Sequence, residues 1–228
     1  MYTNVNLAAP IGALLFLGTG FLLFVAALVL VYSMVSRKFV VAKFALITLG
    51  TIAGLYLGVM LLFSFTSSEK VLARGEEKHF CELDCHLAYS VTDVRETKTL
   101  GAASHQVAAA GTFRVVTVKT RFDETTIGRS RGKAELYPNS RELAVVDGSG
   151  RKYFPSPSGE SALAGSQASG TPITTPLRPG ESYTTTFVFD LPPDIPNPTL
   201  LIHEGEVETR FIIGHENSPL HRKIRFQI

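Results

Sequence analysis

The sequence predicts a two-helix transmembrane hairpin followed by an all-β antiparallel sandwich. Two observations lead to this fold class. Residues 1–36 contain no charged residue, and most of the charge lies beyond Ser68. Beyond that point the long apolar stretches give way to short runs in which apolar and polar residues alternate, a pattern typical of half-buried strands. The 228 residues therefore divide into a membrane part and one β domain.

Residues 11–35 and 44–68 are the two predicted transmembrane helices. Neither stretch contains a charged residue. About 20 apolar residues are enough to cross the hydrocarbon core, and a helix satisfies its own backbone hydrogen bonds in lipid. The first stretch is not expected to be a cleaved signal peptide, because its apolar core is too long and no basic region precedes it.

The connection between the two helices, residues 36–43, sets the expected orientation. It contains Arg37, Lys38 and Lys43. Basic connections tend to stay on the cytoplasmic side, so this loop is predicted to be cytoplasmic. Residues 1–10 and all residues after 68 are then extracytoplasmic. The prediction is a multi-pass protein of the cell inner (plasma) membrane, in contact with membrane lipid, with both termini outside.

The second predicted helix contains a row of small residues, Gly50, Gly54 and Gly58, spaced four apart on one face. Small residues at this spacing let another helix approach closely. Packing against the first helix is the simpler interpretation, since that helix has small residues of its own. A face for self-association or for a partner subunit is the alternative.

Residues 87–228 are predicted to form the β domain. About seven short runs with turn signals between them indicate an antiparallel sandwich. Residues 155–176 are rich in Ser, Gly, Ala and Pro and are expected to be an exposed loop. The runs are HLAYSVTDV, FRVVTVKTRF, a hairpin in RELAVVDGSGRKYF, SYTTTFVFDL, TLLIHEG, TRFIIG and RKIRFQI. Alternation puts Leu87, Tyr89 and Val91 on one face of the first run, and Val116, Val118 and Phe122 on one face of the second. The segment HQVAAAGT between these two runs is expected to be a shorter loop.

Three of these segments also carry a family resemblance. The motifs GTFRVVTVKTRF, ELAVVDGSGRKYFPS and LRPGESYTTTFVFDLPPD resemble the telokin-like, immunoglobulin-related domains that bacteria carry on their outer surface. The resemblance covers residues 87–228 and implies an immunoglobulin-like sandwich in an extracytoplasmic location. It implies no activity, because such sandwiches host many unrelated functions.

Residues 69–86 form a predicted membrane-proximal linker that holds both cysteines and two of the six histidines: His79, Cys81, Cys85 and His86. On the oxidising side of the membrane a disulfide between Cys81 and Cys85 is permitted. A straight strand would hold their Cα atoms about 13 Å apart, so the disulfide requires a turn within CELDC. We favour this disulfide, and two thiols without a role are the least favoured alternative.

The same four residues are also a candidate metal site, because thiolates and imidazoles suit copper or zinc. The plan of two spans, both ends outside and then a β domain resembles subunit II of cytochrome c oxidase, which holds a binuclear copper centre with two cysteines four apart. This chain departs from that pattern, because its cysteines precede the β domain and His86 follows Cys85 directly. A third alternative is haem c, since CELDCH is the C-x-x-C-H motif with one extra residue and His86 as the axial ligand.

The function predicted from these observations is that of a non-enzymatic binding or accessory module. The sequence contains no G-x-S-x-G, H-E-x-x-H or glycine-rich phosphate motif. A formal net charge of +2 gives no reason to expect nucleic acid. A protein partner is expected to meet the β-domain loops or the second helix. A copper-binding or redox protein is the alternative.

Overall fold

The computed structural model describes residues 2–3, 8–82, 85–102, 106–128, 131–165 and 169–228. The chain separates into two compact units. The sandwich unit comprises residues 1–4, 69–205 and 223–228. The helical unit comprises residues 5–68 together with residues 206–222, a segment that the sequence places in the β domain. The predicted boundary between membrane part and β domain is therefore crossed a second time near the C-terminus.

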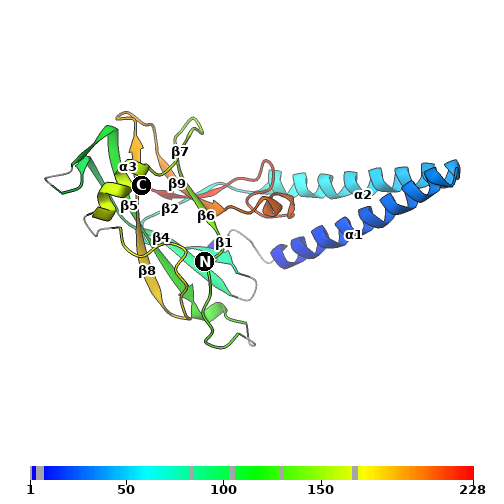
Figure 1. The fold of residues 1–228 in the computed structure, drawn as a ribbon, viewed down its shortest axis with the longest axis horizontal. Coiled ribbons are helices and arrows are strands. Elements are labelled where there is room, and N and C mark those ends of the chain that lie inside the picture. The colour runs from blue at the N-terminus through cyan, green and yellow to red at the C-terminus, as the bar shows by residue number, and fades with distance from the viewer. Residues whose placement is uncertain (1, 4–7, 83–84, 103–105, 129–130, 166–168) are drawn as a thin grey trace. The chain divides into compact units, whose positions relative to one another are not determined.

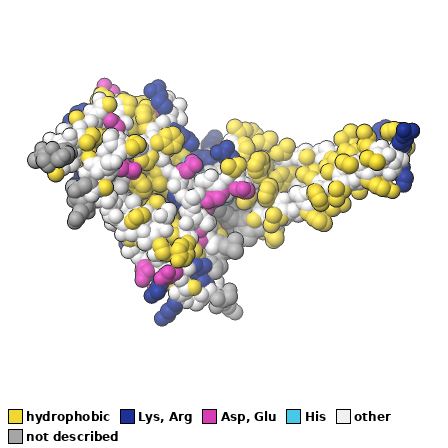
Figure 2. Space-filling model, in the orientation of Figure 1, with side chains coloured by type: hydrophobic (Ala, Val, Ile, Leu, Met, Phe, Trp, Pro, Cys, Tyr) yellow, Lys and Arg dark blue, Asp and Glu magenta, His cyan; other side chains and the backbone are white. Residues whose placement is uncertain are grey.

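Two long apolar helices, α1 (Ala8–Val35) and α2 (Phe39–Thr66), make up most of the helical unit. Both are long and apolar enough to cross a membrane, and nearly all their large side chains are exposed. The turn between them is short because Arg37 adopts a left-handed conformation (φ 57°), which lets the amide of Lys38 donate to the carbonyl of Ser33 at 2.8 Å. Figure 2 shows the apolar side chains along the helices and Lys and Arg side chains at the tip of the pair.

The predicted packing of the glycine row against the first helix is wrong. A Cβ atom built on Gly50, Gly54 or Gly58 would meet nothing within 4 Å. The buried positions of α2 lie on a different face, with spacings close to those of a helix stripe. They are Ala42, Ala45, Met60 and Ser64. Alanine, not glycine, therefore permits the close approach at the end of the pair next to the connecting turn, and the docking face for a partner stays a prediction.

The sandwich unit contains two five-stranded sheets (Figure 1). The first sheet has the order β1-β3-β4-β5-β8 and the second the order β2-β10-β9-β6-β7. The prediction of a sandwich is confirmed at this level. The first sheet consists of β1 (Tyr2–Thr3), β3 (Lys78–Cys81), β4 (His86–Leu100), β5 (Val107–Asp123) and β8 (Ser182–Leu191). The second consists of β2 (Lys70–Leu72), β6 (Arg141–Val146), β7 (Lys152–Tyr153), β9 (Thr199–Glu204) and β10 (Ile224–Gln227).

The sheets are not purely antiparallel, which corrects the predicted fold class. Strand β1 pairs with β3 in parallel, and β2 pairs with β10 in parallel. Strands β2 and β3 both lie inside the predicted linker 69–86, so part of that segment belongs to the sheets. The alternation of side chains was missed there because β2 and β3 are only 3 and 4 residues long.

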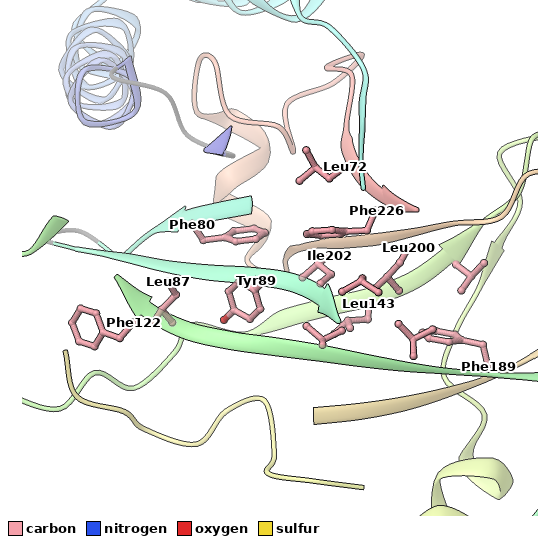
Figure 3. Packing of buried hydrophobic residues seen from close by; sticks show 14 of the residues in the cluster. Leu72, Phe80, Leu87, Tyr89, Phe122, Leu143, Phe189, Leu200, Ile202 and Phe226 are labelled. Atoms are coloured by element: carbon pink, nitrogen blue, oxygen red, sulfur yellow. The ribbon is translucent and has the colours of Figure 1, made fainter. Parts of the chain in front are cut away.

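The core lies between the two sheets and is built from the inward side chains of both (Figure 3). Leu87, Tyr89 and Val91 of β4 share the face predicted for them and are fully buried, as are Val116, Val118 and Phe122 of β5. Burying one such side chain stabilises the fold by about 1.5–3 kcal/mol. Phe80 and Tyr89 meet edge to face, with ring centroids 5.3 Å apart. These contacts fix β3 and β4, the two strands that carry the cysteine–histidine residues.

Three local predictions differ from the structure. The predicted loop 155–176 contains helix α3 (Pro157–Gly165), whose Leu163 is buried against Phe113, Val115 and Val188. The loop expected before residue 112 is instead the start of β5. The predicted strand TRFIIG is the end of a 3₁₀ helix, η2 (Val207–Phe211), and a following loop in the helical unit. In the last case apolar residues pack against helices, so a short apolar run alone did not identify a strand.

Candidate functional site

The register of β3, β4 and β5 decides which way the cysteine–histidine residues point. Leu87 of β4 pairs with Phe80 of β3 on one side and with Phe122 of β5 on the other, and all three side chains face the core. Neighbouring positions along a strand point to opposite faces of the sheet. His79 and Cys81 therefore lie on the outer face of β3, and His86, the cross-strand partner of Cys81, lies on the same face.

The predicted disulfide is absent, because Cys81 and Cys85 remain thiols that are not at disulfide distance. Cys85 is buried in the hydrophobic core cluster, whereas Cys81 is half-buried on the outer face. The amide of Glu82 donates to the carbonyl of Cys85 at 2.8 Å, which closes the β3–β4 turn. The intervening Leu83 and Asp84 of the predicted CELDC turn lie outside the described residues. The pleat of the hairpin thus separates the two sulfurs.

The four predicted metal or haem ligands are therefore not brought together. His79, Cys81 and His86 share the outer face, and Cys85 faces the core. A thioether bond to haem at Cys85 would require its removal from the core, which argues against the haem c alternative. Within the described parts of the chain, no group of three or more His, Cys, Asp and Glu side chains is placed to hold a metal ion.

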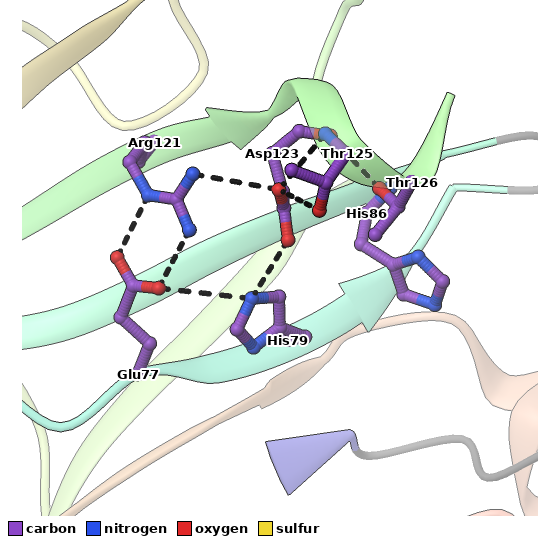
Figure 4. A network of polar contacts seen from close by, with 7 residues as sticks. All are labelled: Glu77, His79, His86, Arg121, Asp123, Thr125 and Thr126. Carbon is purple, nitrogen blue, oxygen red and sulfur yellow. Dashed lines mark hydrogen bonds and ion pairs between the residues drawn. The ribbon is translucent and has the colours of Figure 1, made fainter. Parts of the chain in front are cut away.

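The imidazole of His79 is the centre of a polar cluster on this outer face (Figure 4). Its Nε2 lies 3.2 Å from Asp123 Oδ2 and 3.7 Å from Glu77 Oε2. Arg121 holds Glu77 through two hydrogen bonds, from Nε at 2.8 Å and from Nη2 at 2.6 Å. This paired geometry is the strong form of an arginine–carboxylate contact. The result is a rigid frame of carboxylates around one face of the ring.

Local chain geometry positions the other members of the cluster. Asp123 ends β5 and caps the 3₁₀ helix η1 (Glu124–Thr126), because its Oδ1 accepts from the amide and the hydroxyl of Thr125 at 3.1 and 2.7 Å. Short polar side chains are favoured at such caps. The next hydroxyl, Thr126 Oγ1, accepts from the amide of His86 at 2.9 Å. The end of β5 therefore ties both histidine-bearing strands into one frame.

The electrostatics of the cluster favour a neutral imidazole beside ionised carboxylates. Burial lowers the pKa of His79, although Glu77 and Asp123 act in the opposite direction. The hydrogen bond from Arg121 lowers the pKa of Glu77. Burial alone would raise the pKa of Asp123, but the Thr125 hydrogen bonds and Arg121 outweigh it and lower the pKa.

His79 and His86 each have one ring nitrogen without a hydrogen-bond partner among the described residues. His79 is buried, and its Nδ1 is a buried atom without a hydrogen-bond partner among the described residues. His86 Nδ1 is likewise a buried atom without a hydrogen-bond partner among the described residues. The ring centroids of His79 and His86 are 6.4 Å apart. Buried polar atoms are usually satisfied, so each exception needs an explanation.

An open hollow of about 540 Å³ lies over this cluster. Three carboxylates face one guanidinium there, so the hollow is acidic when His79 is neutral. Such a surface attracts basic or hydrogen-bond-donating groups. Its lining consists of Gly75, Glu76, Glu77, His79, Arg121, Asp123 and Thr125.

A second polar cluster lies inside the sandwich, on the opposite face of the same strands. Lys78 is fully buried, and its Nζ donates to the carbonyls of Ile202 and Ile224 at 2.7 and 3.3 Å. Arg141 is buried with an ion pair to Glu82, and its guanidinium lies 4.4 Å from the Phe80 ring centroid. Breaking a buried pair leaves an uncompensated charge, which is strongly destabilising. These charges therefore fix the pairing of the two sheets near the β3–β4 turn.

Sequence reasoning identified His79, Cys81 and His86 but missed Glu77, Arg121 and Asp123. A usable signal existed for two of them. Arg121 and Asp123 flank Phe122, which alternation puts on one apolar face of the strand, so both had to lie on the opposite face. That they meet His79 depends on the pairing of β3 with β4 and β4 with β5, which a single sequence does not reveal.

Comparison with known proteins leaves the family open. No family model matches the chain, and a search of curated proteins finds no match, so neither resemblance stated above is supported at that level. A secreted protein from Mycobacterium tuberculosis, MPT63, is 12% identical with a TM-score of 0.42, covering 71% of this chain and 98% of that one. A conserved hypothetical protein from Bacillus anthracis is 16% identical with a TM-score of 0.40, covering 57% and 89%. The yjhA protein from Bacillus subtilis is 11% identical with a TM-score of 0.40, covering 68% and 98%.

The first prediction concerns Glu82. Burial raises its pKa from 4.5 to about 7, against the opposing effect of Arg141. The folded state therefore keeps a proton that the unfolded state releases between pH 4.5 and 7, and the contribution of Glu82 to stability falls as pH rises through that window. We expect the free energy of unfolding of the native protein, relative to Glu82→Gln, to decrease by up to about 3 kcal/mol between pH 4.5 and 7.5.

The measurement is denaturant unfolding of both proteins in the same detergent, followed by tyrosine fluorescence, at a series of pH values. Taking the difference removes the opposite trend from the histidines, whose pKa values are lowered by burial. A difference that is flat with pH would show that Glu82 stays ionised in its pair with Arg141.

Proposed function

We propose that this protein is a membrane-anchored, non-enzymatic binding module. The helices α1 and α2 cross the inner membrane twice, the basic loop at Arg37 and Lys38 lies in the cytoplasm, and both termini and the sandwich face outward. Support comes from the exposed apolar surface of both helices. An exposed apolar surface of this size is unfavourable in water and is typical of a membrane-contacting segment. We infer further that the sandwich is an immunoglobulin-like variant, since two sheets enclose one core as in that class.

The acidic hollow over His79 is the proposed contact site. It is the observation that carries the proposal, because hydrogen bonds within the protein hold its charged side chains in place. Arg121 orients Glu77, and Thr125 orients Asp123. Preorganised polar groups of this kind bind without an ordering cost. The matching partner presents a basic or amide-rich segment to the outer sheet face of β3, β4 and β5.

The second prediction tests this site by photo-crosslinking in intact membranes. A photoreactive amino acid at Thr125, an exposed lining residue whose backbone amide continues to hold Asp123 after the replacement, is expected to form a discrete adduct with a protein. The same probe at Lys152, exposed on β7 of the other sheet, is the matched control. The Thr125 adduct should fall at least severalfold when Glu77 and Asp123 are replaced by Gln and Asn. Equal adducts from both probe positions, or none from Thr125, would contradict the proposed site.

A metal-binding role is the second candidate, and one observation favours it. His79 Nε2 is held by the carboxylate of Asp123 while its Nδ1 is buried and unused. Metal-ligating histidines commonly donate one ring N–H to a carboxylate in this way, which directs the other nitrogen to the metal. His86 offers a second such Nδ1, and Cys81 is its cross-strand partner. Rotation of these side chains on the outer face would give a two-nitrogen, one-sulfur set, which suits Cu⁺ or Zn²⁺.

The third prediction follows from this candidate. If the role is correct, titration of the purified protein with Zn²⁺ or Cu⁺ under reducing conditions will show one site per chain, and His86→Gln will weaken it at least tenfold. His203→Gln is the matched control, because His203 is also half-buried but lies on β9 of the other sheet. Isothermal calorimetry gives both affinities. Equal loss in the two variants, or no binding by the native protein, would eliminate the metal candidate and leave the binding module untouched.

A further inference from the structure

We propose that residues 206–222 form a collar that sits at the outer lipid–water boundary and binds the headgroup region of the bilayer. This inference rests on the proposed membrane placement of α1 and α2 and adds the depth at which they sit. The collar comprises η2 and the loop after it, and it belongs to the same compact unit as the helices.

The collar makes specific contacts with both helices. The Phe211 ring stacks on Phe16 of α1, with centroids 6.4 Å apart and planes at 13°. The hydroxyl of Tyr56 in α2 donates to the carbonyl of Phe211. A Cβ atom on Gly12 would lie 2.5 Å from the carbonyl oxygen of Ile213, so a glycine is needed where the collar crosses α1. The collar therefore packs on the helices from the level of Phe16 and Tyr56 out to Gly12 of α1 and to Ser67, whose hydroxyl accepts from the amide of Arg222 at 2.8 Å.

The lengths of the helices agree with a boundary at this level. Each helix has 28 residues, so at ~1.5 Å per residue each is about 42 Å long, well beyond the ~30 Å hydrocarbon core. From Val35 to Phe16 the distance along α1 is about 29 Å, and from Phe39 to Tyr56 along α2 it is about 26 Å. The stretch between the basic turn and the collar thus matches the lipid. The excess of both helices lies alongside the collar, which meets Gly12 of α1 and Ser67 directly after α2.

The composition of the collar suits an interface. Its exposed side chains include three large apolar ones, Val207, Phe211 and Leu220. Exposed charged side chains stand beside them, such as Glu208, Arg210 and Arg222. Segments with both kinds of side chain settle at the boundary between headgroups and acyl chains. Tyr56 also fits this level, because tyrosine is enriched at membrane interfaces.

The backbone of the collar is folded so that it needs little water. Successive turns pair the amides of Ile212, His215 and Ser218 with the carbonyls of Thr209, Ile212 and His215, at 3.4, 3.1 and 3.0 Å. The hydroxyl of Ser218 also donates to the carbonyl of Ile212 at 2.6 Å. Unsatisfied backbone groups are costly near hydrocarbon, so this internal pairing permits partial immersion.

The proposed level shifts α2 in the membrane relative to the span 44–68 expected from the sequence. The centre of that span is close to Leu55, whereas the centre between Phe39 and Tyr56 is close to Ile47. Both side chains are exposed on the helix surface, so a probe at either position should not disturb packing. Lys43 would lie one turn inside the cytoplasmic boundary, from which its long side chain reaches the headgroups.

The test uses the absence of tryptophan from the native chain. Four single-tryptophan variants of the full protein, Phe211→Trp, Ile47→Trp, Leu55→Trp and Phe154→Trp, are reconstituted into phosphatidylcholine vesicles that carry bromine either near the carbonyl end or near the methyl end of the acyl chains. Phe154 is an exposed residue of the sandwich unit and serves as the aqueous control.

We expect bromines near the carbonyl end (shallow) to quench the probes at 211 and 55 at least twofold more than bromines near the methyl end (deep) do. The probe at 47 should show the reverse order, and the probe at 154 should not be quenched. Deep quenching at 55 with shallow quenching at 47, or no quenching at 211 while 47 is quenched, would overturn the collar and leave the membrane anchor standing. Absence of quenching at both 47 and 55 would instead overturn the membrane placement itself.

Discussion

The alternation of side chains along the β3–β4 hairpin is the constraint on which the rest of the sandwich unit depends. Phe80 and Leu87 must face the core, so His79, Cys81 and His86 must face outward. The same rule sends Lys78 into the core, where backbone carbonyls of the second sheet receive its ammonium group. A shift of one residue would exchange the two sets. It would bury His79 and His86 among the apolar side chains of the core and break the contacts of both polar clusters.

This constraint links the fold to the proposed role. The outer face carries a frame of paired carboxylates around His79, and the inner face carries the buried pair of Arg141 and Glu82. Buried charge pairs add little net stability but penalise alternative arrangements. The inner cluster therefore holds the two sheets in the one alignment that keeps the outer cluster assembled. A rigid outer face on a tethered domain is what a binding module requires, whether its ligand is a protein segment or a metal ion.

The sequence was informative where one rule governed a long stretch. Charge-free runs identified both apolar helices, and period-two alternation placed Leu87, Tyr89 and Val91 on the buried face. It was not informative where tertiary contacts overruled local pattern. The run TRFIIG has the pattern of a strand, but it is the end of η2 and a loop in the helical unit. Gly50 lies away from the contact between the helices, although glycine suits close packing. The nearer carboxylate partner of His79, Asp123, comes from β5, more than forty residues away, and only strand pairing brings it there.

The most direct test of this arrangement is thiol labelling of intact spheroplasts with a membrane-impermeant maleimide, without reductant. Half-buried Cys81 is predicted to react, and Cys85, which is 1% exposed, is predicted to react only after denaturation. Single Cys81→Ser and Cys85→Ser variants assign the signal. Labelling of one thiol, at residue 81, would agree with an outward-facing hairpin in the described register. Labelling only after reduction would show a disulfide, and labelling only after the membrane is broken would place the sandwich inside the cell; either result would contradict the account.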